Sequence, residues 1–531
     1  MEDNNLNKEN KDNKKGIGRR DVLKSLATLP VAGALLYGAF KKKQLEHYKH
    51  SELLKTLSLD TGPVEAPSIV EKRNGDTSTL RVGIIGTGGR GLYLMRSLGF
   101  IQPLWIDEWT ESARINKQDT RIEMYRQMED LNVAITGISD VFTVHRDAGL
   151  EASSNLYRAG TNGKRGEPAK VYKHYKDLLA SDDIDAVVIA TPDHWHADMI
   201  IDAAKAGKHI YAEKPLSLTV EETYAIERAV KENNVVFQLG HQNRQIESHL
   251  KAREVVKKNI LGKITMVETF TNRNSPWGAW VYDIHPETTP QNVDWKQFLG
   301  SAPDHPFSAE RFFRWRCWWD YSTGLTGDLF THEYDVINQV LDVGIPDTAS
   351  ASGGIYYWKD GREVPDVLHV SYEFQKLDMN LLYSATLANS QHRKKTFFGH
   401  DAYMELDNDL VVYADRDSTR FKTAIEDGVI PTHSPMITHV PGRGSIDAIS
   451  SPTEQYFAQR GLLYTYRGGQ QVDTAHLHVK EWINAIRHGS PVSCGIKESV
   501  EEAITAHMGT VSYRNQKKVF WDRDKKEIVF G

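Results

Sequence analysis

Residues 80–91 constrain the fold of this chain more than any other stretch. The apolar segment Leu80–Ile85 runs directly into Gly86-Thr-Gly-Gly-Arg-Gly91, and a helical pattern begins at Leu92. Glycines at these positions permit a tight turn and let backbone N–H groups approach a pyrophosphate at the helix N-terminus. The glycine motif alone is a weak signal, but a strand before it and a helix after it predict a dinucleotide site in a doubly wound parallel sheet.

The carboxyl ends of the following strands should complete that site, because ligands bind there in doubly wound sheets. The second strand is predicted at 133–140, since residues 103–128 read as an insertion, and it ends at Asp140. An Asp at this position pairs with ribose hydroxyls and repels a 2′-phosphate, which favours NAD, although Arg146 keeps NADP open. We expect the cofactor to contact Gly86, Thr87, Gly88, Gly89, Arg90, Gly91, Asp140, Thr191, Pro192, His194, His196, Glu213, Lys214, Gln242 and Asn243.

A carboxylate and an imidazole stand four residues apart in Asp328-Leu-Phe-Thr-His332. On a helix this spacing places both side chains on one face, one turn apart, so the carboxylate can orient the ring and raise its basicity. The spacing also arises often by chance. An exposed helical pair is the simpler interpretation unless other motifs point at the same face.

Several motifs taken together resemble those of the Gfo/Idh/MocA oxidoreductases. They are the glycine loop, Thr191-Pro-Asp-His-Trp-His196, Glu213-Lys-Pro215 and Asp328-x-x-x-His332, with a further match in Trp482-Ile-Asn-Ala-Ile-Arg-His-Gly-Ser-Pro-Val-Ser493. The resemblance covers roughly residues 80–525. It implies an α/β protein: an N-terminal Rossmann domain, then an α/β domain with a large, open, mainly antiparallel sheet. It also implies that Lys214, Asp328 and His332 form the catalytic set, and it allows a cis peptide at Lys214–Pro215.

The second domain is predicted from extended segments that alternate apolar and polar residues, as half-buried antiparallel strands do. Six of the 12 tryptophans fall between Trp277 and Trp319. This aromatic belt could stack on sugar rings, or it could fill a core or a subunit interface. The predicted strands are 264–272, 348–357, 367–374, 379–386, 396–398 and 402–407. Residues 411–474 are predicted to form long loops. Two helices, 476–488 and 497–514, and a strand, 518–521, are predicted after them. The expected substrate contacts are Lys214, Trp277, Arg314, Trp315, Trp318, Asp328 and His332.

The N-terminus resembles a twin-arginine export signal. Arg19 and Arg20 precede an apolar run at 26–40, about 15 residues long, which is short for a membrane span of about 20 residues and suits a signal. Three lysines follow the run directly, so cleavage stays open, and residues 22–40 could anchor the protein in the inner membrane. We therefore expect a periplasmic or membrane-anchored protein. The predicted divisions are 1–43 for the signal, 44–79 for a helical stalk and linker, 80–245 for the NAD(P)-binding domain and 246–531 for the substrate-binding domain.

Composition argues against several other classes of protein. A net charge of −6 and a pI of about 6.4 disfavour a broad nucleic-acid-binding surface. The two cysteines, Cys317 and Cys494, allow one disulfide but no cysteine-based metal centre, and no compact histidine spacing predicts a metal. We expect a small carbohydrate as substrate and a homo-oligomeric assembly.

Oxidation of a carbinol by hydride transfer needs a base and a cation beside the oxygen. We assign His332 as the general base, Lys214 as the cation that holds the oxygen, and Asp328 as the group that orients His332 or a substrate hydroxyl. The favoured function is an NAD(P)-dependent sugar or glycoside dehydrogenase with tightly bound cofactor. An exported NAD-dependent glycosidase that oxidises, eliminates, hydrates and reduces again is the alternative. A dinucleotide-binding protein without catalysis is a third hypothesis.

Overall fold

The computed structural model describes residues 78–154, 166–440, 464–467 and 470–531, with scattered positions between 38 and 57. The chain divides into a small unit, 1–60 with 423–431, and a large unit, 61–422 with 432–531. The described positions of the predicted stalk are helical. The export signal up to residue 37 and the linker at 58–77 lie outside the described residues. Within the described part of the chain, no helix combines the length and apolarity needed to cross a membrane.

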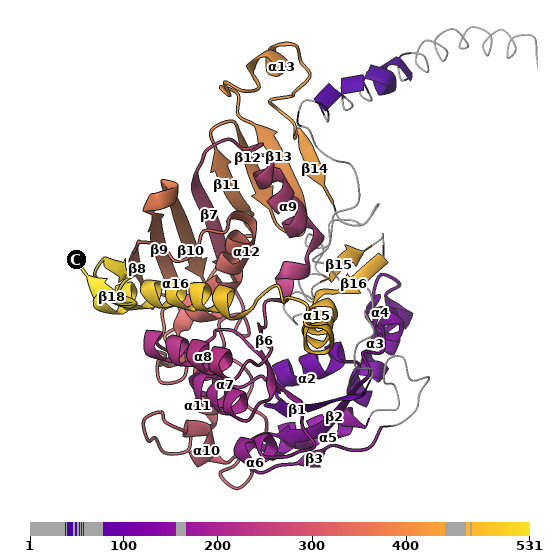
Figure 1. Cartoon of the computed structure of the whole chain (residues 1–531), viewed down its shortest axis with the longest axis vertical. Helices are drawn as coiled ribbons and strands as arrows, with labels where there is room; N and C mark the ends of the chain where they lie inside the picture. The colour runs from indigo at the N-terminus through magenta and orange to yellow at the C-terminus, as the bar shows by residue number, and fades with distance from the viewer. Residues whose placement is uncertain are drawn as a thin grey trace, which may run out of the picture. The chain divides into compact units, whose positions relative to one another are not determined.

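The first domain contains a six-stranded parallel sheet with the strand order β3-β2-β1-β4-β5-β6 (Figure 1). The central strand β4 is apolar and buried throughout, as a strand covered on both faces must be. This order confirms the predicted doubly wound sheet and brings the carboxyl ends of its strands to one edge. The elements are β1 (Leu80–Ile85), α2 (Gly89–Ser97), α3 (Pro103–Ile115), α4 (Arg121–Gln127), β2 (Val133–Ser139), α5 (Thr143–Ser153), β3 (Lys170–Val171), α6 (Tyr175–Leu179), β4 (Ala186–Ile189), α7 (His196–Lys205), β5 (His209–Ala212), α8 (Val220–Glu232) and β6 (Phe237–Leu239).

One helix in the core of this domain comes from the far end of the chain. Helix α15 (Thr474–His488) packs against α2, and residues of both helices share one hydrophobic cluster with β1. Its Trp482 is fully buried and meets Tyr211 edge to face, with ring centroids 5.8 Å apart. The linear division at 245/246 could not anticipate this, because an amphipathic pattern does not say which core a helix joins.

The second domain contains a ten-stranded sheet with the order β14-β13-β12-β11-β7-β10-β9-β8-β17-β18. Only β7 and β10 pair in parallel among the described strands of this sheet, which confirms the predicted large, mainly antiparallel sheet. Helices α9 and α16 pack against it, and α12 is joined to β7 by a hydrogen bond from the Thr269 hydroxyl to Glu333 (Figure 1). Its elements are α9 (Glu247–Lys257), β7 (Ile264–Asn272), α10 (Trp295–Leu299), α11 (Ala309–Phe313), α12 (Thr331–Leu341), β8 (Thr348–Gly354), β9 (Val367–Phe374), β10 (Met379–Thr386), β11 (Lys395–Gly399), β12 (Ala402–Leu406), β13 (Leu410–Ala414), β14 (Ile437–His439), α16 (Ile496–Asn515), β17 (Val519–Asp522) and β18 (Glu527–Phe530).

The prediction of long loops over 411–474 is wrong for part of that stretch. Strands β13 and β14 extend the ten-stranded sheet, α13 (Lys422–Glu426) follows β13, and β15 (Tyr464–Arg467) pairs with β16 (Gln470–Asp473). The strands are short and separated by charged, glycine-rich connections, so their alternation is too brief to register. Residues 441–463 lie outside the described part. Cys317 and Cys494 are both buried and unpaired, so the disulfide that composition allowed does not form.

Candidate active site

A cavity of about 1260 Å³ is lined by residues of both domains. The glycine loop and Asp140 line it from the first domain, and Asp328 and His332 line it from the second. Sites for one small ligand usually measure about 300–1,000 Å³. The cavity therefore has room for a dinucleotide and a second small molecule, as the sequence predicted.

The glycine loop fits a dinucleotide pyrophosphate. Gly86 has a φ of +88°, and a Cβ on Gly91 would stand 2.0 Å from the Gly86 carbonyl oxygen, so both positions require glycine. A Cβ on Gly89 meets nothing within 4 Å, so this position faces open space. Helix α2 begins there, capped by Gly88 without a side-chain hydrogen bond and without an acidic residue in its first turn. Its N-terminal N–H groups are thus available to an anion.

Asp140 lies at the end of β2, beside the glycine loop. Its Oδ2 accepts a hydrogen bond from the Thr87 backbone N–H at 2.6 Å, and its Oδ1 accepts one from the Phe142 N–H at 2.8 Å. The carboxylate still lines the cavity, as a partner for ribose hydroxyls must. Arg146, which kept NADP open, is ion-paired with Asp147 at 2.9 Å and does not line the cavity. The site therefore favours NAD.

The turn after β4 holds four of the predicted cofactor contacts, and only two of them line the cavity. Thr191 and Pro192 line the cavity, whereas His194 and His196 do not. The His194 Nε2 lies 2.7 Å from the Phe298 carbonyl oxygen, and the two His196 ring nitrogens lie 2.6 and 3.0 Å from the carbonyl oxygens of Pro215 and Thr191. Both histidines are buried and brace the backbone rather than face the cofactor space.

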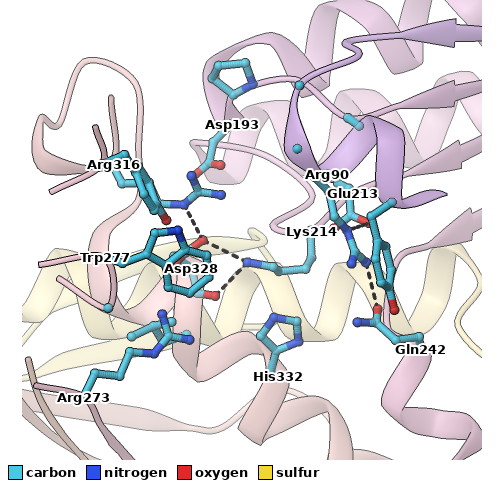
Figure 2. Close-up of a pocket in the computed structure, with 18 of the residues that line it drawn as sticks. Arg90, Asp193, Glu213, Lys214, Gln242, Arg273, Trp277, Arg316, Asp328 and His332 are labelled. Carbon is cyan, nitrogen blue, oxygen red and sulfur yellow. Dashed lines mark hydrogen bonds and ion pairs between the residues drawn. The ribbon is translucent and has the colours of Figure 1, made fainter. Parts of the chain in front are cut away.

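The ends of β5 and β6 meet the first turn of α2. The Arg90 guanidinium donates to Glu213 Oε1 at 2.6 Å and to Gln242 Oε1 at 3.0 Å (Figure 2). Charge-assisted bonds of this kind are among the stronger protein hydrogen bonds. They tie the glycine loop to the segments that follow β5 and β6. Asn243 also lines the cavity.

Lys214 is bound to Asp328, and the Lys214–Pro215 peptide is cis, as the resemblance allowed. The Lys214 Nζ donates to Asp328 Oδ1 at 2.9 Å and to the Asp328 backbone oxygen at 2.7 Å (Figure 2). The Arg316 Nε donates to the same Oδ1 at 2.9 Å, and the Trp280 indole N–H donates to Oδ2 at 3.0 Å. One carboxylate thus positions two cations.

Burial and charge set the protonation of this group. Burial alone would raise the pKa of Asp328, but Arg316 and Lys214 outweigh it and hold that pKa well below its usual range. Burial raises the pKa of Asp193 to about 7, although Arg316 opposes the shift. Burial, followed by the charges of Lys214 and His241, lowers the pKa of His332 well below its ordinary value. His332 is therefore neutral at pH 7 and able to accept a proton.

Asp328 and His332 face the same cavity, but no hydrogen bond joins them within the part of the chain that the structure describes. The Asp328 side-chain oxygens accept hydrogen bonds from Lys214, Arg316 and Trp280 instead. Asp328 lies in a π-helical turn, Thr326–Phe330, and His332 in the first turn of α12. Both side chains still line the cavity, and Lys214 lies beside them (Figure 2).

A buried ionic cluster stands behind His332. The His241 ring meets the His332 ring edge to face, with centroids 5.6 Å apart. Its Nδ1 is 3.8 Å from Asp335 Oδ2, its Nε2 is 3.3 Å from Glu502 Oε2, and Arg244 pairs with Asp335 at 2.7 Å. Burial would lower the pKa of His241, but Asp335 and Glu502 outweigh burial and raise it. Asp335 and Glu502 therefore favour the positively charged form of the ring that faces His332.

The aromatic belt is divided between the cavity wall and the protein interior. Trp277 and Trp315, two of the expected substrate contacts, line the cavity. Trp318 is buried beneath the Arg311 guanidinium, 5.0 Å from its ring centroid, and Arg314 is ion-paired with Glu310 at 2.8 Å. Neither Trp318 nor Arg314 lines the cavity, since both side chains are used in packing the belt.

Four residues around the Asp328 carboxylate were not among the expected site residues: Asp193, Arg273 and Arg316, which line the cavity, and Trp280, which donates to Asp328. Asp193 falls inside the motif that supplied His194 and His196, yet its side chain is the one that turns towards Arg316 (Figure 2). Arg316 belongs to the run of arginines in the belt, where only tertiary packing decides which one faces the ligand. No motif marks Arg273 or Trp280.

The two domains each match one part of a known protein family. Residues 80–241 match an oxidoreductase family with an NAD-binding Rossmann fold (GFO_IDH_MocA), and residues 247–350 match the C-terminal α/β domain of that family. A levoglucosan dehydrogenase of Pseudarthrobacter phenanthrenivorans is 30% identical over 191 residues, 34% of this chain and 41% of that protein. A glycosyl hydrolase family 109 protein of Shewanella putrefaciens is 29% identical over 174 residues, 32% of this chain and 31% of that protein.

The chain spans half or less of the length of such curated relatives. A solved structure of levoglucosan dehydrogenase in complex with NADH and levoglucosan superimposes with a TM-score of 0.53 at 18% identity. The superposition covers 83% of this chain and 99% of that one. At this identity the likeness establishes the shared two-domain fold.

Proposed function

This chain belongs to the Gfo/Idh/MocA family of NAD-binding oxidoreductases, and from that premise we propose that it is an NAD-dependent dehydrogenase acting on a carbinol of a sugar or glycoside. The observation that carries the proposal is the shared cavity. A glycine loop fit for a pyrophosphate, a lysine held by a buried carboxylate and a neutral histidine all line it. The relationship to a levoglucosan dehydrogenase supports a sugar as substrate.

Each catalytic side chain has a separate task in this reaction. NAD, when bound, supplies the hydride acceptor. The Lys214 ammonium holds the carbinol oxygen and stabilises the negative charge that develops there. A ring nitrogen of His332 takes the hydroxyl proton, which its neutral state permits. Asp328 stays ionised and keeps the ammonium in place.

An NAD-dependent glycosidase is the second candidate, favoured by the relationship to glycosyl hydrolase family 109 proteins. Such a reaction oxidises the sugar, eliminates the aglycone, adds water and reduces again, so it needs a further base near the neighbouring carbon. The segment after β6, Gly240-His-Gln-Asn-Arg244, resembles the Gly-x-Gln-x-Arg pattern of the dehydrogenases instead. Gln242 and Arg244 of that pattern bind Arg90 and Asp335.

Product analysis tests the two candidates against each other. The protein is purified without added cofactor, any nucleotide released on denaturation is identified, and NMR follows products from a glycoside panel with added NAD. A ketone with equimolar NADH is the expected result. Free aglycone without net NADH supports the glycosidase instead, and no product from any glycoside contradicts both.

We also propose that the protein is exported through the twin-arginine route to the periplasm, anchored by residues 22–40 if the signal is not cut. The supporting features are Arg19, Arg20 and the apolar run that follows them. Replacing both arginines with lysine should retain the protein in the cytoplasm, as fractionation of cells would show. Homo-oligomerisation is a further proposal, which sedimentation velocity tests directly.

A further inference from the structure

Positive charge exceeds negative charge where Lys214 and Asp328 meet. Three cations, Lys214, Arg273 and Arg316, line this part of the cavity. Despite burial, Arg316 and Lys214 hold the pKa of Asp328 well below its usual range, and its carboxylate already receives hydrogen bonds from both. Asp193 has a pKa raised to about 7 by burial, so it carries only part of a charge near neutral pH. This part of the cavity wall therefore holds a cation that no carboxylate of a described residue neutralises.

That cation is Arg273. Its guanidinium makes no hydrogen bond or ion pair with any described residue, while its charge is still felt at Asp328 and Tyr282. Figure 2 shows it on the side of Lys214 and His332 away from Arg90 and Glu213, which mark the cofactor end. Arg273 is partly buried in the cavity wall, so its guanidinium is open to a negatively charged ligand.

The position of Arg273 is fixed by the large sheet. It follows β7 directly, its backbone N–H donates to the Thr386 oxygen at 2.9 Å, and its carbonyl accepts from the Asn389 N–H at 3.0 Å. These backbone bonds hold the Cα of Arg273 at the edge of the cavity, from which the guanidinium reaches the wall. Arg393, in contrast, is exposed and stacks on the Phe270 ring at the same cavity wall.

We propose that the substrate is a sugar acid or its glycoside, and that Arg273 binds its carboxylate while Lys214 and His332 hold the reacting carbinol. The guanidinium fork matches a carboxylate in a planar, two-bond arrangement. Among the three cations around Asp328, one unpaired arginine balances one carboxylate, whereas a sugar phosphate brings up to two charges and would draw on several donors. This assignment rests on the proposed function in naming the ligand a substrate.

Binding to the NAD-loaded enzyme tests the assignment without requiring turnover. Glucuronate and its neutral amide, glucuronamide, have nearly the same shape, and isothermal titration calorimetry measures both dissociation constants. We expect glucuronate to bind about tenfold or more tightly in the natural protein. The Arg273→Gln variant should bring the ratio close to one, while Arg393→Gln should leave it unchanged.

Equal binding of acid and amide by the natural protein overturns the assignment. A preference for glucuronate that survives in Arg273→Gln also overturns it, because Arg273 would then not bind the carboxylate. A preference that disappears equally in Arg393→Gln overturns it as well, because the total positive charge of the cavity, and not Arg273, would then select the acid. Tighter binding of glucose 6-phosphate than of glucuronate would also overturn the assignment, because the site would then be specific for a phosphate and not for a carboxylate. NADH formation in the same samples reports separately on the proposed function, so oxidation of the amide alone would refute the carboxylate and leave the dehydrogenase intact.

Discussion

Lys214 is the residue on which both the positioning and the charge stabilisation of the proposed reaction depend. Replacing it with Met removes the ammonium but leaves Asp328 bound to Arg316 and Trp280. We expect kcat to fall about 100- to 1,000-fold, the usual loss when a donor to a developing oxyanion is removed. NAD affinity, measured by calorimetry, should change little. Lys395→Met is the control, since that lysine is paired with Glu333 elsewhere in the cavity, and a loss as large there would argue against a special role for Lys214.

The lowered pKa of His332 fixes the direction of the pH dependence. The base works in its neutral form, so kcat/KM should stay level as the pH falls to about 6.5 and decline only below it. His241→Gln removes a positive ring from behind His332, which raises the pKa of His332 and moves the declining limb to higher pH. A pH–rate profile measures both. The assignment of His332 as the base is contradicted if kcat/KM of the natural protein already declines above pH 6.5. It is also contradicted if the decline begins at the same pH in His241→Gln.

Single residues were predictable where a motif fixes them. The glycine loop, Asp140, Lys214 and His332 lie where the sequence placed them around one cavity. His194, His196, Arg314 and Trp318 have suitable chemistry and neighbouring positions, but their side chains bind backbone carbonyls or pack against other residues. A sequence shows which groups are near a strand end and not which way each one turns, because packing decides rotamers.

At the scale of elements, the most consequential difference from expectation concerns the partners of the Asp328 carboxylate. A regular helix through Asp328 and His332 was expected to let the carboxylate orient the imidazole. Asp328 lies instead in a π turn, Thr326–Phe330, and its carboxylate accepts hydrogen bonds from Lys214 and Arg316. No propensity scale predicts a π turn, which depends on tertiary contacts, whereas the strands β7, β9 and β10 were predicted at their observed bounds from alternation alone.

The glycine turn permits a test of an element rather than of a side chain. In Gly91→Ala the new Cβ would lie 2.0 Å from the Gly86 carbonyl oxygen, so the turn must shift. We expect a loss of about 1–3 kcal/mol in unfolding free energy, typical of overpacking, and at least tenfold weaker NAD binding. Gly89→Ala is the matched control for stability, because its Cβ meets nothing within 4 Å and alanine favours a helix. Equal stability of the two variants in urea unfolding would refute this account of the turn.

At the scale of the whole molecule, the cofactor domain depends on the C-terminal part of the chain. Trp482 of α15 is fully buried in the same hydrophobic cluster as β1 and α2. The Trp482→Ala substitution should lower the free energy of unfolding by about 3–5 kcal/mol, as large-to-small core substitutions do. Trp277→Ala, at an exposed position of the cavity wall, should cost less than about 1 kcal/mol. Similar losses for both in urea unfolding would mean that α15 is not part of this core.

The central claim is that a carbinol hydride leaves the substrate for NAD in the cavity that holds Lys214 and His332. The most direct measurement uses a glycoside with deuterium at its carbinol carbons, the purified protein and NAD, with mass spectrometry of the nicotinamide product. One deuterium per NADH, together with the corresponding ketone and their joint loss in Lys214→Met, is the predicted result. Glycoside consumption that leaves NAD unlabelled, or labelling that persists unchanged in Lys214→Met, would contradict the claim.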